Sequence, residues 1–266
     1  MEVIIRPDGE RAATLAAQLI GARLQAKPTS VLGLATGRTM ERVYEKLVAM
    51  HRQDGLDFSD CSTFNLDEYI GLSADDDRSY RAYMNHHFFH QVNIDLANTH
   101  VPDGMASDLK AEAVRYETSI RQCGGIDLQL LGIGDAGHIG FNEPLSAFRS
   151  RTRDKMLAPT TRRQNAAMFG GRVDDVPERA LTMGVGTILD ASELLILVTG
   201  SAKASILAKA VEGPITAMIS ASAIQLHANC KVVIDDDAAR ELRGRDYYDW
   251  MFQNEPAWAA FRDEDS

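Results

Sequence analysis

The stretch IDLQLLGI, residues 126–133, is the strongest predicted strand of this sequence. Its residues are mostly apolar, and glycines follow it, which is typical of a buried strand that ends in a loop. Shorter apolar runs of the same kind lie on both sides of it in the chain. They predict further strands at residues 3–5, 30–35, 62–66, 193–199 and 231–234.

Helical patterns separate these strands. Apolar residues recur at helical spacing over residues 9–26, 39–52, 78–91, 107–122, 201–211 and 219–226. Strand–helix alternation predicts right-handed βαβ units and therefore an α/β fold with a mainly parallel central sheet. No Pro- or Ser-rich linker interrupts the chain, so residues 1–266 are predicted to form one domain.

The composition excludes several classes of protein. The net charge is −10, and an acidic chain lacks the basic surface that nucleic-acid binding needs. The three cysteines are far apart, which argues against disulfides and thiolate metal sites. Residues 1–10 do not form a signal peptide, and no apolar run is long enough to span a bilayer. The sequence therefore predicts a soluble cytoplasmic protein without a membrane or nucleic-acid partner.

Ligands of such folds bind beyond the carboxyl ends of the strands. The first candidate there is Thr36-Gly37-Arg38-Thr39, which joins a strand to a helix. Backbone N–H groups at such a turn and the two threonine hydroxyls suit a phosphate group. An ordinary turn capped by Thr39 explains the same residues. Nucleotide-binding glycine motifs are absent at this turn.

The second candidate is TFNLDEY, residues 63–69, where an apolar strand runs directly into two acids. Asp67 is predicted to act as a general base if a substrate lies above the strand end. Alternatively, Asp67 and Glu68 are turn residues in contact with water.

The third candidate follows residues 126–133 directly, in the segment GDAGHIGFNEP, residues 134–144. Its glycines let the backbone approach a ligand closely. His138 and Glu143 are predicted to form an acid/base pair, because imidazole moves a proton near neutral pH and a carboxylate sets its charge and tautomer.

Other charged groups are weaker candidates. Lys203 lies near a helix start, where its positive charge interacts unfavourably with the helix dipole. A bound phosphate would offset this interaction. The basic segment 150–155 suits an anion or a solvated face. His86 and His90 are one helical turn apart but lack a nearby third ligand, so we predict no metal site.

These segments, in this order, resemble the glucosamine-6-phosphate deaminase/isomerase family over about residues 30–250. The resemblance is carried by TFNLDEYIGL (63–72), GHIGFNEP (137–144), SRTRDK (150–155), ERALTMGVGTILDA (178–191), VTGSAK (198–203) and AVEGP (210–214). It implies a Rossmann-like three-layer fold. It also implies conversion of glucosamine 6-phosphate and water to fructose 6-phosphate and ammonia, without a cofactor.

The resemblance also implies roles for single residues. The aspartate that matches Asp67 moves the proton from carbon 2 to carbon 1. The histidine that matches His138, aided by the acid that matches Glu143, opens the sugar ring. The loop that matches residues 36–39 and the lysine that matches Lys203 hold the phosphate.

Some family members are hexamers that N-acetylglucosamine 6-phosphate activates. Their effector site matches Ser146, Arg153 and Lys155, so the resemblance implies an effector site and a homo-oligomer here. A tyrosine near the C-terminus of those proteins corresponds to Tyr247 or Tyr248. A threonine of that site is replaced by Met156.

Three positions depart from the family's pattern. Ala136 stands where an Asp or Asn orients the histidine, and Asp135 is a candidate substitute. Ala167 stands where an arginine contacts the substrate phosphate, and Arg38 stands where the phosphate loop has a small residue. We therefore hypothesise that Arg38 takes over the phosphate contact.

Two other functions remain open at this point. One is the same active site with another substrate, such as galactosamine 6-phosphate or a lactone. The other is a sugar-phosphate sensor without turnover. The sequence leaves no room for a DNA-binding segment before the first strand, and it retains Asp67, His138 and Glu143, which favours an enzyme.

Overall fold

A seven-stranded parallel sheet forms the centre of the chain. The computed structural model describes residues 1–262, and every strand pair of this sheet is parallel. The strand order is β1-β10-β9-β6-β2-β3-β5. The strands are β1 (Glu2–Arg6), β2 (Val31–Leu34), β3 (Ser62–Asn65), β5 (Thr99–His100), β6 (Leu128–Leu131), β9 (Leu194–Val198) and β10 (Cys230–Asp235). The predicted fold class is confirmed.

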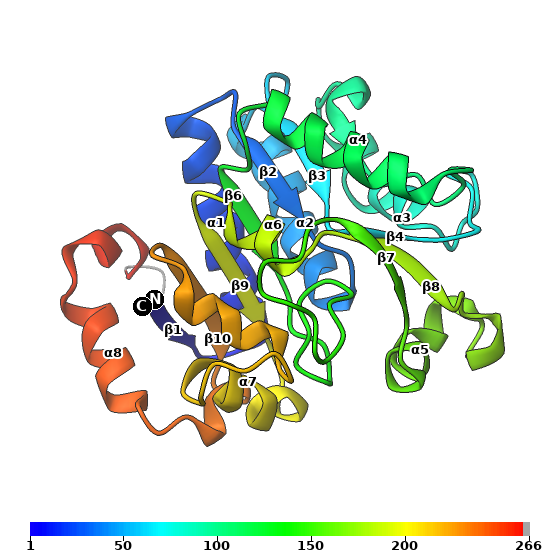
Figure 1. The fold of residues 1–266 in the computed structure, drawn as a ribbon. Coiled ribbons are helices and arrows are strands. Elements are labelled where there is room, and N and C mark those ends of the chain that lie inside the picture. Colours follow the sequence, from blue (N-terminus) through cyan, green and yellow to red (C-terminus); the bar gives the residue numbers. More distant parts are fainter. Residues whose placement is uncertain (263–266) are drawn as a thin grey trace.

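Helices cover both faces of the sheet (Figure 1). In Figure 1, α1 and α2 lie on one face, and α4 and α6 lie on the other. The helices are α1 (Gly9–Ala26), α2 (Arg38–Asp54), α3 (Tyr80–His87), α4 (Leu109–Gln122), α5 (Pro159–Asn165), α6 (Val185–Leu189), α7 (Ala204–Val211) and α8 (Arg245–Asn254). Within residues 1–262, no helix is both long and apolar enough to cross a bilayer.

Three helices, α1, α3 and α4, begin at a side-chain cap. The carboxylate of Asp8 accepts the backbone N–H of Arg11 at 2.8 Å and starts α1. Asp108 accepts two backbone N–H groups at the start of α4, and Ser79 caps α3. Such caps satisfy the otherwise unpaired first amides of a helix.

The strand order reverses between β2 and β6. From β2 the chain adds β3 and β5 toward one edge, and from β6 it adds β9 and β10 toward the other. The loops that follow β2 and β6 therefore separate to opposite faces and leave a crevice at the carboxyl ends of these two strands. The two glycine-containing segments of the sequence analysis, residues 36–39 and 134–144, follow β2 and β6 and so lie at this crevice.

A second, three-stranded antiparallel sheet was not predicted from the sequence. It consists of β4 (Asp67–Tyr69), β8 (Arg179–Thr182) and β7 (Arg153–Met156), in that order. The basic segment 150–155 thus ends in a strand, and Asp67 is the first residue of a strand rather than a turn residue. A separate apolar cluster that includes Tyr69, Phe141 and Phe169 packs beside this sheet.

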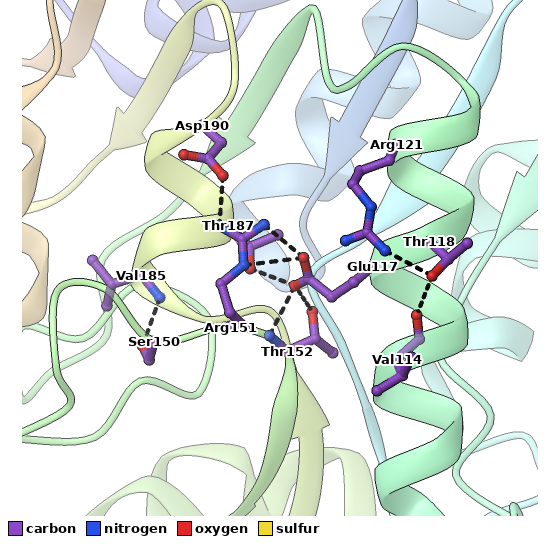
Figure 2. Close-up of polar contacts among 10 residues, drawn as sticks. All are labelled: Val114, Glu117, Thr118, Arg121, Ser150, Arg151, Thr152, Val185, Thr187 and Asp190. Atoms are coloured by element: carbon purple, nitrogen blue, oxygen red, sulfur yellow. Dashed lines mark hydrogen bonds and ion pairs between the residues drawn. The ribbon is translucent and has the colours of Figure 1, made fainter.

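Glu117 of α4 fixes the start of the second sheet (Figure 2). Its buried carboxylate accepts the backbone N–H of Thr152 at 2.9 Å and the hydroxyls of Thr152 and Thr187 at 2.6 and 2.5 Å. Its second oxygen pairs with Arg151 at 2.6 Å. One side chain therefore joins α4, the residues before β7, and α6.

Most predicted elements lie within a few residues of their expected positions. The strand predicted over 126–133 is shorter, Leu128–Leu131. Before its start, the side chain of Asp127 accepts the backbone N–H of Val31 at 2.8 Å. The predicted helix 219–226 is a 3-10 helix, Ser220–Leu226. The helix expected over 78–91 is α3 followed by a 3-10 turn, Phe89–Gln91.

Candidate active site

A cavity of about 610 Å³ occupies the crevice beyond β2 and β6. Its walls include loop residues 36–39, together with Asp67, His138 and Lys203. Eight of the predicted substrate-site residues were named from separate segments, and seven of them line this one cavity; Glu143 does not. This convergence of polar groups in a concave site makes it the candidate active site.

The loop after β2 is built to face a ligand. Gly37 has φ +125°, a conformation that L side chains rarely adopt, and an added Cβ would meet nothing within 4 Å. The hydroxyl of Tyr83 donates to the Gly37 carbonyl at 3.0 Å and accepts the Gly37 N–H at 3.3 Å. Tyr83 of α3 therefore fixes the loop that was predicted to hold a phosphate.

Lys203 brings a cation to the same cavity. It lies at the end of a 3-10 turn, Ser201–Lys203, directly before α7. Its ammonium forms an ion pair with Asp135. Asp135 therefore does not serve as the substitute for the group missing at Ala136, because its carboxylate pairs with Lys203 instead of His138.

Asp67 lies at the point where the main sheet and the second sheet meet. Its carboxyl group is 6% exposed, and Thr182 Oγ1 donates to Oδ2 at 3.5 Å. The pKa of Asp67 is raised to about 8, because burial and the adjacent Glu68 charge outweigh the hydrogen bonds from Thr182 and the Phe141 N–H. A carboxylate of raised pKa is a stronger base than an ordinary aspartate.

His138 lies over a glycine of its own loop. A Cβ built on Gly134 would be 2.0 Å from His138 Nε2, so only glycine leaves room for the ring. The Gly134 N–H donates to the His138 carbonyl at 2.9 Å, which closes the loop. Burial lowers the pKa of His138, and Lys203 lowers it as well, whereas Glu143 and Asp135 raise it. The imidazole is therefore neutral at pH 7 and able to accept a proton.

Glu143 lies behind His138. Its Oε1 accepts the N–H of Ala158 at 2.9 Å, just before α5, and its Oε2 is 3.9 Å from His138 Nδ1. Both Oε2 and Nδ1 are buried, and neither has a hydrogen-bond partner among the described residues. The predicted pair is adjacent but not hydrogen-bonded.

The residues of the implied effector site lie elsewhere. Arg153 Nη2 donates to Ser146 Oγ at 3.2 Å, whereas its buried Nη1 has no partner within residues 1–262. Lys155 follows two residues later on β7. Tyr247 and Tyr248 lie on α8 beside β1, on the opposite side of the molecule from β7 (Figure 1), so this chain does not bring them to the other three residues.

Several cavity residues were missed by the sequence analysis. Tyr80, Tyr83 and His87 of α3 and Gln164 and Asn165 of α5 all line the cavity. Ser79 marks the start of α3, but nothing in its helical pattern indicates which face meets the loop after β2. Helix α5 is seven residues long, too short for a clear period.

Two of the three positions that depart from the family's pattern line the same cavity. Arg38 and Ala167 both line the cavity, as the exchange of one guanidinium for another requires. Among residues 1–262, no group of three or more His, Cys, Asp or Glu side chains is placed to hold a metal ion.

Comparison with known proteins gives consistent matches. Residues 9–233 match the family described as glucosamine-6-phosphate isomerases/6-phosphogluconolactonase. The chain is 47% identical to a glucosamine-6-phosphate deaminase of Arthrobacter sp. strain FB24 over 97% of this chain and 99% of that protein. It is 48% identical to one of Geobacillus sp. strain WCH70 over 90% of this chain and 94% of that protein.

Solved structures agree with these matches. A monomeric glucosamine-6-phosphate deaminase superposes with a TM-score of 0.88 at 43% identity, covering 91% of this chain and all of that one. A 6-phosphogluconolactonase from Leishmania guyanensis superposes with a TM-score of 0.69 at 20% identity, over 90% of this chain and 97% of that one. The second likeness concerns the fold alone.

Proposed function

Because this chain belongs to the glucosamine-6-phosphate isomerase/6-phosphogluconolactonase family, we propose that it converts glucosamine 6-phosphate and water to fructose 6-phosphate and ammonia. The observation that carries the proposal is the position of Asp67. A buried carboxyl group with a pKa of about 8 faces the same cavity as the phosphate loop, His138 and Lys203. Isomerisation of an amino sugar needs this combination of a strong base and an anion site.

In this proposal Asp67 shuttles one proton. It removes the proton from carbon 2 of the open-chain amino sugar, and the carbonyl oxygen at carbon 1 takes a proton from the substrate's ammonium group, which leaves an enolamine. Returning the proton to carbon 1 gives an imine at carbon 2, and water hydrolyses this imine to the ketone and ammonia. The substrate's ammonium group favours the ionised form of a nearby carboxyl, so binding itself prepares Asp67 as a base.

His138 opens the sugar ring in this proposal. A neutral imidazole takes the proton from the hydroxyl at carbon 1 and delivers a proton to the ring oxygen. Glu143, 3.9 Å away, stabilises the imidazolium that forms. The low pKa of His138 in the empty cavity keeps the ring neutral until the substrate arrives.

The phosphate is placed between the loop after β2 and Lys203. Thr36 and Thr39 offer hydroxyls, and the start of α2 at Arg38 offers backbone N–H groups. Arg38 supplies the guanidinium that Ala167 lacks. The phosphate displaces Asp135 from Lys203, because a dianion competes well with one exposed carboxylate.

Ser146, Arg153 and Lys155 are proposed to bind a second, anionic effector. The Nη1 of Arg153, which is buried without a partner among the described residues, supports this role, since an unpaired buried N–H donor is costly. We extend the proposal to a homo-oligomer, in which a neighbouring copy provides the remaining contacts.

The rest of the proposal concerns the whole chain. We propose that it acts as one domain, because β3 passes into β4 with only Leu66 between the two sheets. The cysteines Cys61, Cys123 and Cys230 are free, which suits a reducing cytoplasm. No step of the proposed reaction needs a cofactor.

The test uses the pure protein and glucosamine 6-phosphate. We expect fructose 6-phosphate and ammonia in equal amounts, with turnover increased by N-acetylglucosamine 6-phosphate. Release of ammonia from galactosamine 6-phosphate alone would show that this sugar phosphate is the substrate. Hydrolysis of 6-phosphogluconolactone alone would show that the protein is a lactonase. Binding of glucosamine 6-phosphate by folded protein without any product would instead identify a sensor.

A further inference from the structure

Glu68 is a buried acid that the proposed reaction does not use. Its side chain follows Asp67 on β4 and is 3% exposed. Oε1 accepts the N–H groups of Tyr69 and Tyr80 at 2.8 and 3.0 Å, and Oε2 accepts the N–H of Arg81 at 2.9 Å. Tyr80 and Arg81 are the first two residues of α3, so Glu68 caps this helix from a different element.

This cap connects the base to the rest of the cavity. Helix α3 carries Tyr80 and Tyr83 into the cavity wall, and Tyr83 holds the phosphate loop through Gly37. The ring of Tyr80 also packs against Tyr69, with ring centroids 4.9 Å apart. The position of α3 therefore depends on the residue next to the base.

The second consequence is electrostatic. Glu68 and Asp67 are consecutive buried acids, and the charge of Glu68 raises the pKa of Asp67. The pKa of Glu68 is raised to about 7, because burial outweighs its three backbone N–H partners and Arg81. Glu68 is therefore ionised in the pH range where Asp67, with a pKa of about 8, gains and loses its proton.

We propose that Glu68 is a positioning residue of the reaction: it holds α3 against the cavity through the backbone N–H groups of Tyr80 and Arg81, and its charge keeps Asp67 strongly basic. This inference rests on the proposed role of Asp67. Glu68 does not line the cavity, so it acts through its neighbours.

Other charged groups face the pair and must be held constant in any test. Arg81 of α3 faces Glu68, and His138 and Lys203 share the cavity with Asp67. The tyrosines that interact electrostatically with Asp67 are Tyr69 of β4, Tyr80 of α3 and Tyr116 of α4. None of these residues is itself substituted when only Glu68 is changed.

Two substitutions separate the cap from the charge. Glu68→Gln keeps the length and removes the charge, whereas Glu68→Asp keeps the charge and shortens the reach to α3. Glu212→Gln is the matched control, because Glu212 also accepts two backbone N–H groups at a helix start, from Arg243 and Gly244 before α8. It lies outside the cavity.

The readout is the pH dependence of kcat/KM for glucosamine 6-phosphate. Activity rises with pH as Asp67 loses its proton, so a lower pKa moves this rise to lower pH. In Glu68→Gln we expect the rise about one pH unit lower and kcat roughly three- to ten-fold lower, since a weaker base removes the proton more slowly. In Glu68→Asp and Glu212→Gln the rise stays at the wild-type pH. An unshifted rise in Glu68→Gln would overturn the inference.

A second measurement needs no turnover. Because the charge of Glu68 raises the pKa of Asp67, Glu68→Gln must lower the pKa of Asp67, read from its ¹³C carboxyl shift against pH. An unchanged pKa of Asp67 in this variant would also overturn the inference. Wild-type protein without turnover would refute the proposed function, but it would leave this measurement readable.

Discussion

His138 Nδ1 and Glu143 Oε2 lie 3.9 Å apart, and both atoms are buried without a hydrogen-bond partner among residues 1–262. Leaving a buried acceptor or donor unpaired costs about 1–3 kcal/mol. The distance is too long for a hydrogen bond but short enough for attraction once the ring is protonated. The pair is therefore stabilised most strongly in the state that follows proton uptake by His138.

Asp67→Asn is expected to abolish turnover and to stabilise the fold. The folded-state pKa of Asp67 is about 8, above the usual value near 3.8, so the folded wild type binds the extra proton between these two pH values. Its stability therefore falls as pH rises through this window, and asparagine has no such loss. We expect the variant to be more stable by about 1–2 kcal/mol at pH 8 and equal near pH 4, measured by thermal melting. A less stable variant at pH 8 would contradict the raised pKa.

Gly134→Ala is expected to displace the His138 ring, because the new Cβ would lie 2.0 Å from Nε2. A shift of about 1 Å in a reacting group can lower the rate about a hundredfold, and we expect a loss of this size in kcat. Gly132→Ala is the control next to the same loop, since its Cβ meets the flexible end of Met40 at 3.2 Å and the Leu197 carbonyl at an ordinary 4.0 Å, and its loss in kcat should be much smaller. Equal rates in both variants would show that the ring position is unimportant.

Arg38→Ala is expected to weaken binding of the phosphate. Loss of one charge-assisted hydrogen bond should raise the Michaelis constant for glucosamine 6-phosphate about tenfold, while kcat/KM for unphosphorylated glucosamine stays unchanged. Arg42→Ala is the matched control, because Arg42 lies one helical turn further along α2, outside the cavity wall. If Arg38→Ala leaves the Michaelis constant unchanged, another group holds the phosphate.

Glu117→Gln is expected to lower stability without a direct effect on chemistry. The glutamine amide has one acceptor oxygen, whereas the partners of Glu117 use two. The substitution also leaves Arg151 without its buried carboxylate (Figure 2). We expect a cost of about 2–3 kcal/mol at pH 7. Although burial opposes it, hydrogen bonds from Thr152 and Thr187 hold the pKa of Glu117 below its usual value, so the difference from wild type should shrink as pH falls below about 4.

The control for this prediction is Thr118→Ala, on the exposed side of the same helix. Its stability in urea should stay within about 0.5 kcal/mol of the wild type. A similar loss in both variants would mean that α4, rather than the Glu117 contacts, is responsible.

Six strands of the parallel sheet could be predicted from their apolar runs, whereas the edge strand β5, Thr99–His100, is two polar residues long and was missed. The second sheet could not be predicted, for three reasons. Strand β4 has three residues, and two of them are acids. Strand β7, Arg153–Met156, has no fully buried residue and so lacks an alternating pattern. The partners are also far apart in the chain, as Asp67 pairs with Thr182.

The candidate site was predictable where a residue follows a strand directly. Asp67, His138 and loop residues 36–39 were found in this way, because strand ends converge at one edge of a parallel sheet. Glu68 looked like a solvated turn residue, since its partners on α3 are backbone groups that leave no mark in the sequence. The Lys203–Asp135 pair joins two loops, and their approach depends on tertiary structure alone.

Leu66 is the only residue between β3 and β4, so the chain leaves one sheet and enters the other without slack. One inserted residue here would move Asp67 by about 3.3 Å and turn its side chain to the other face. Segments such as the one before β8 can change in length during evolution and reshape the sugar pocket. The number of residues between β3 and Asp67 cannot change in this way. Relatives with new substrates should therefore differ in their loops and keep the single residue between β3 and β4.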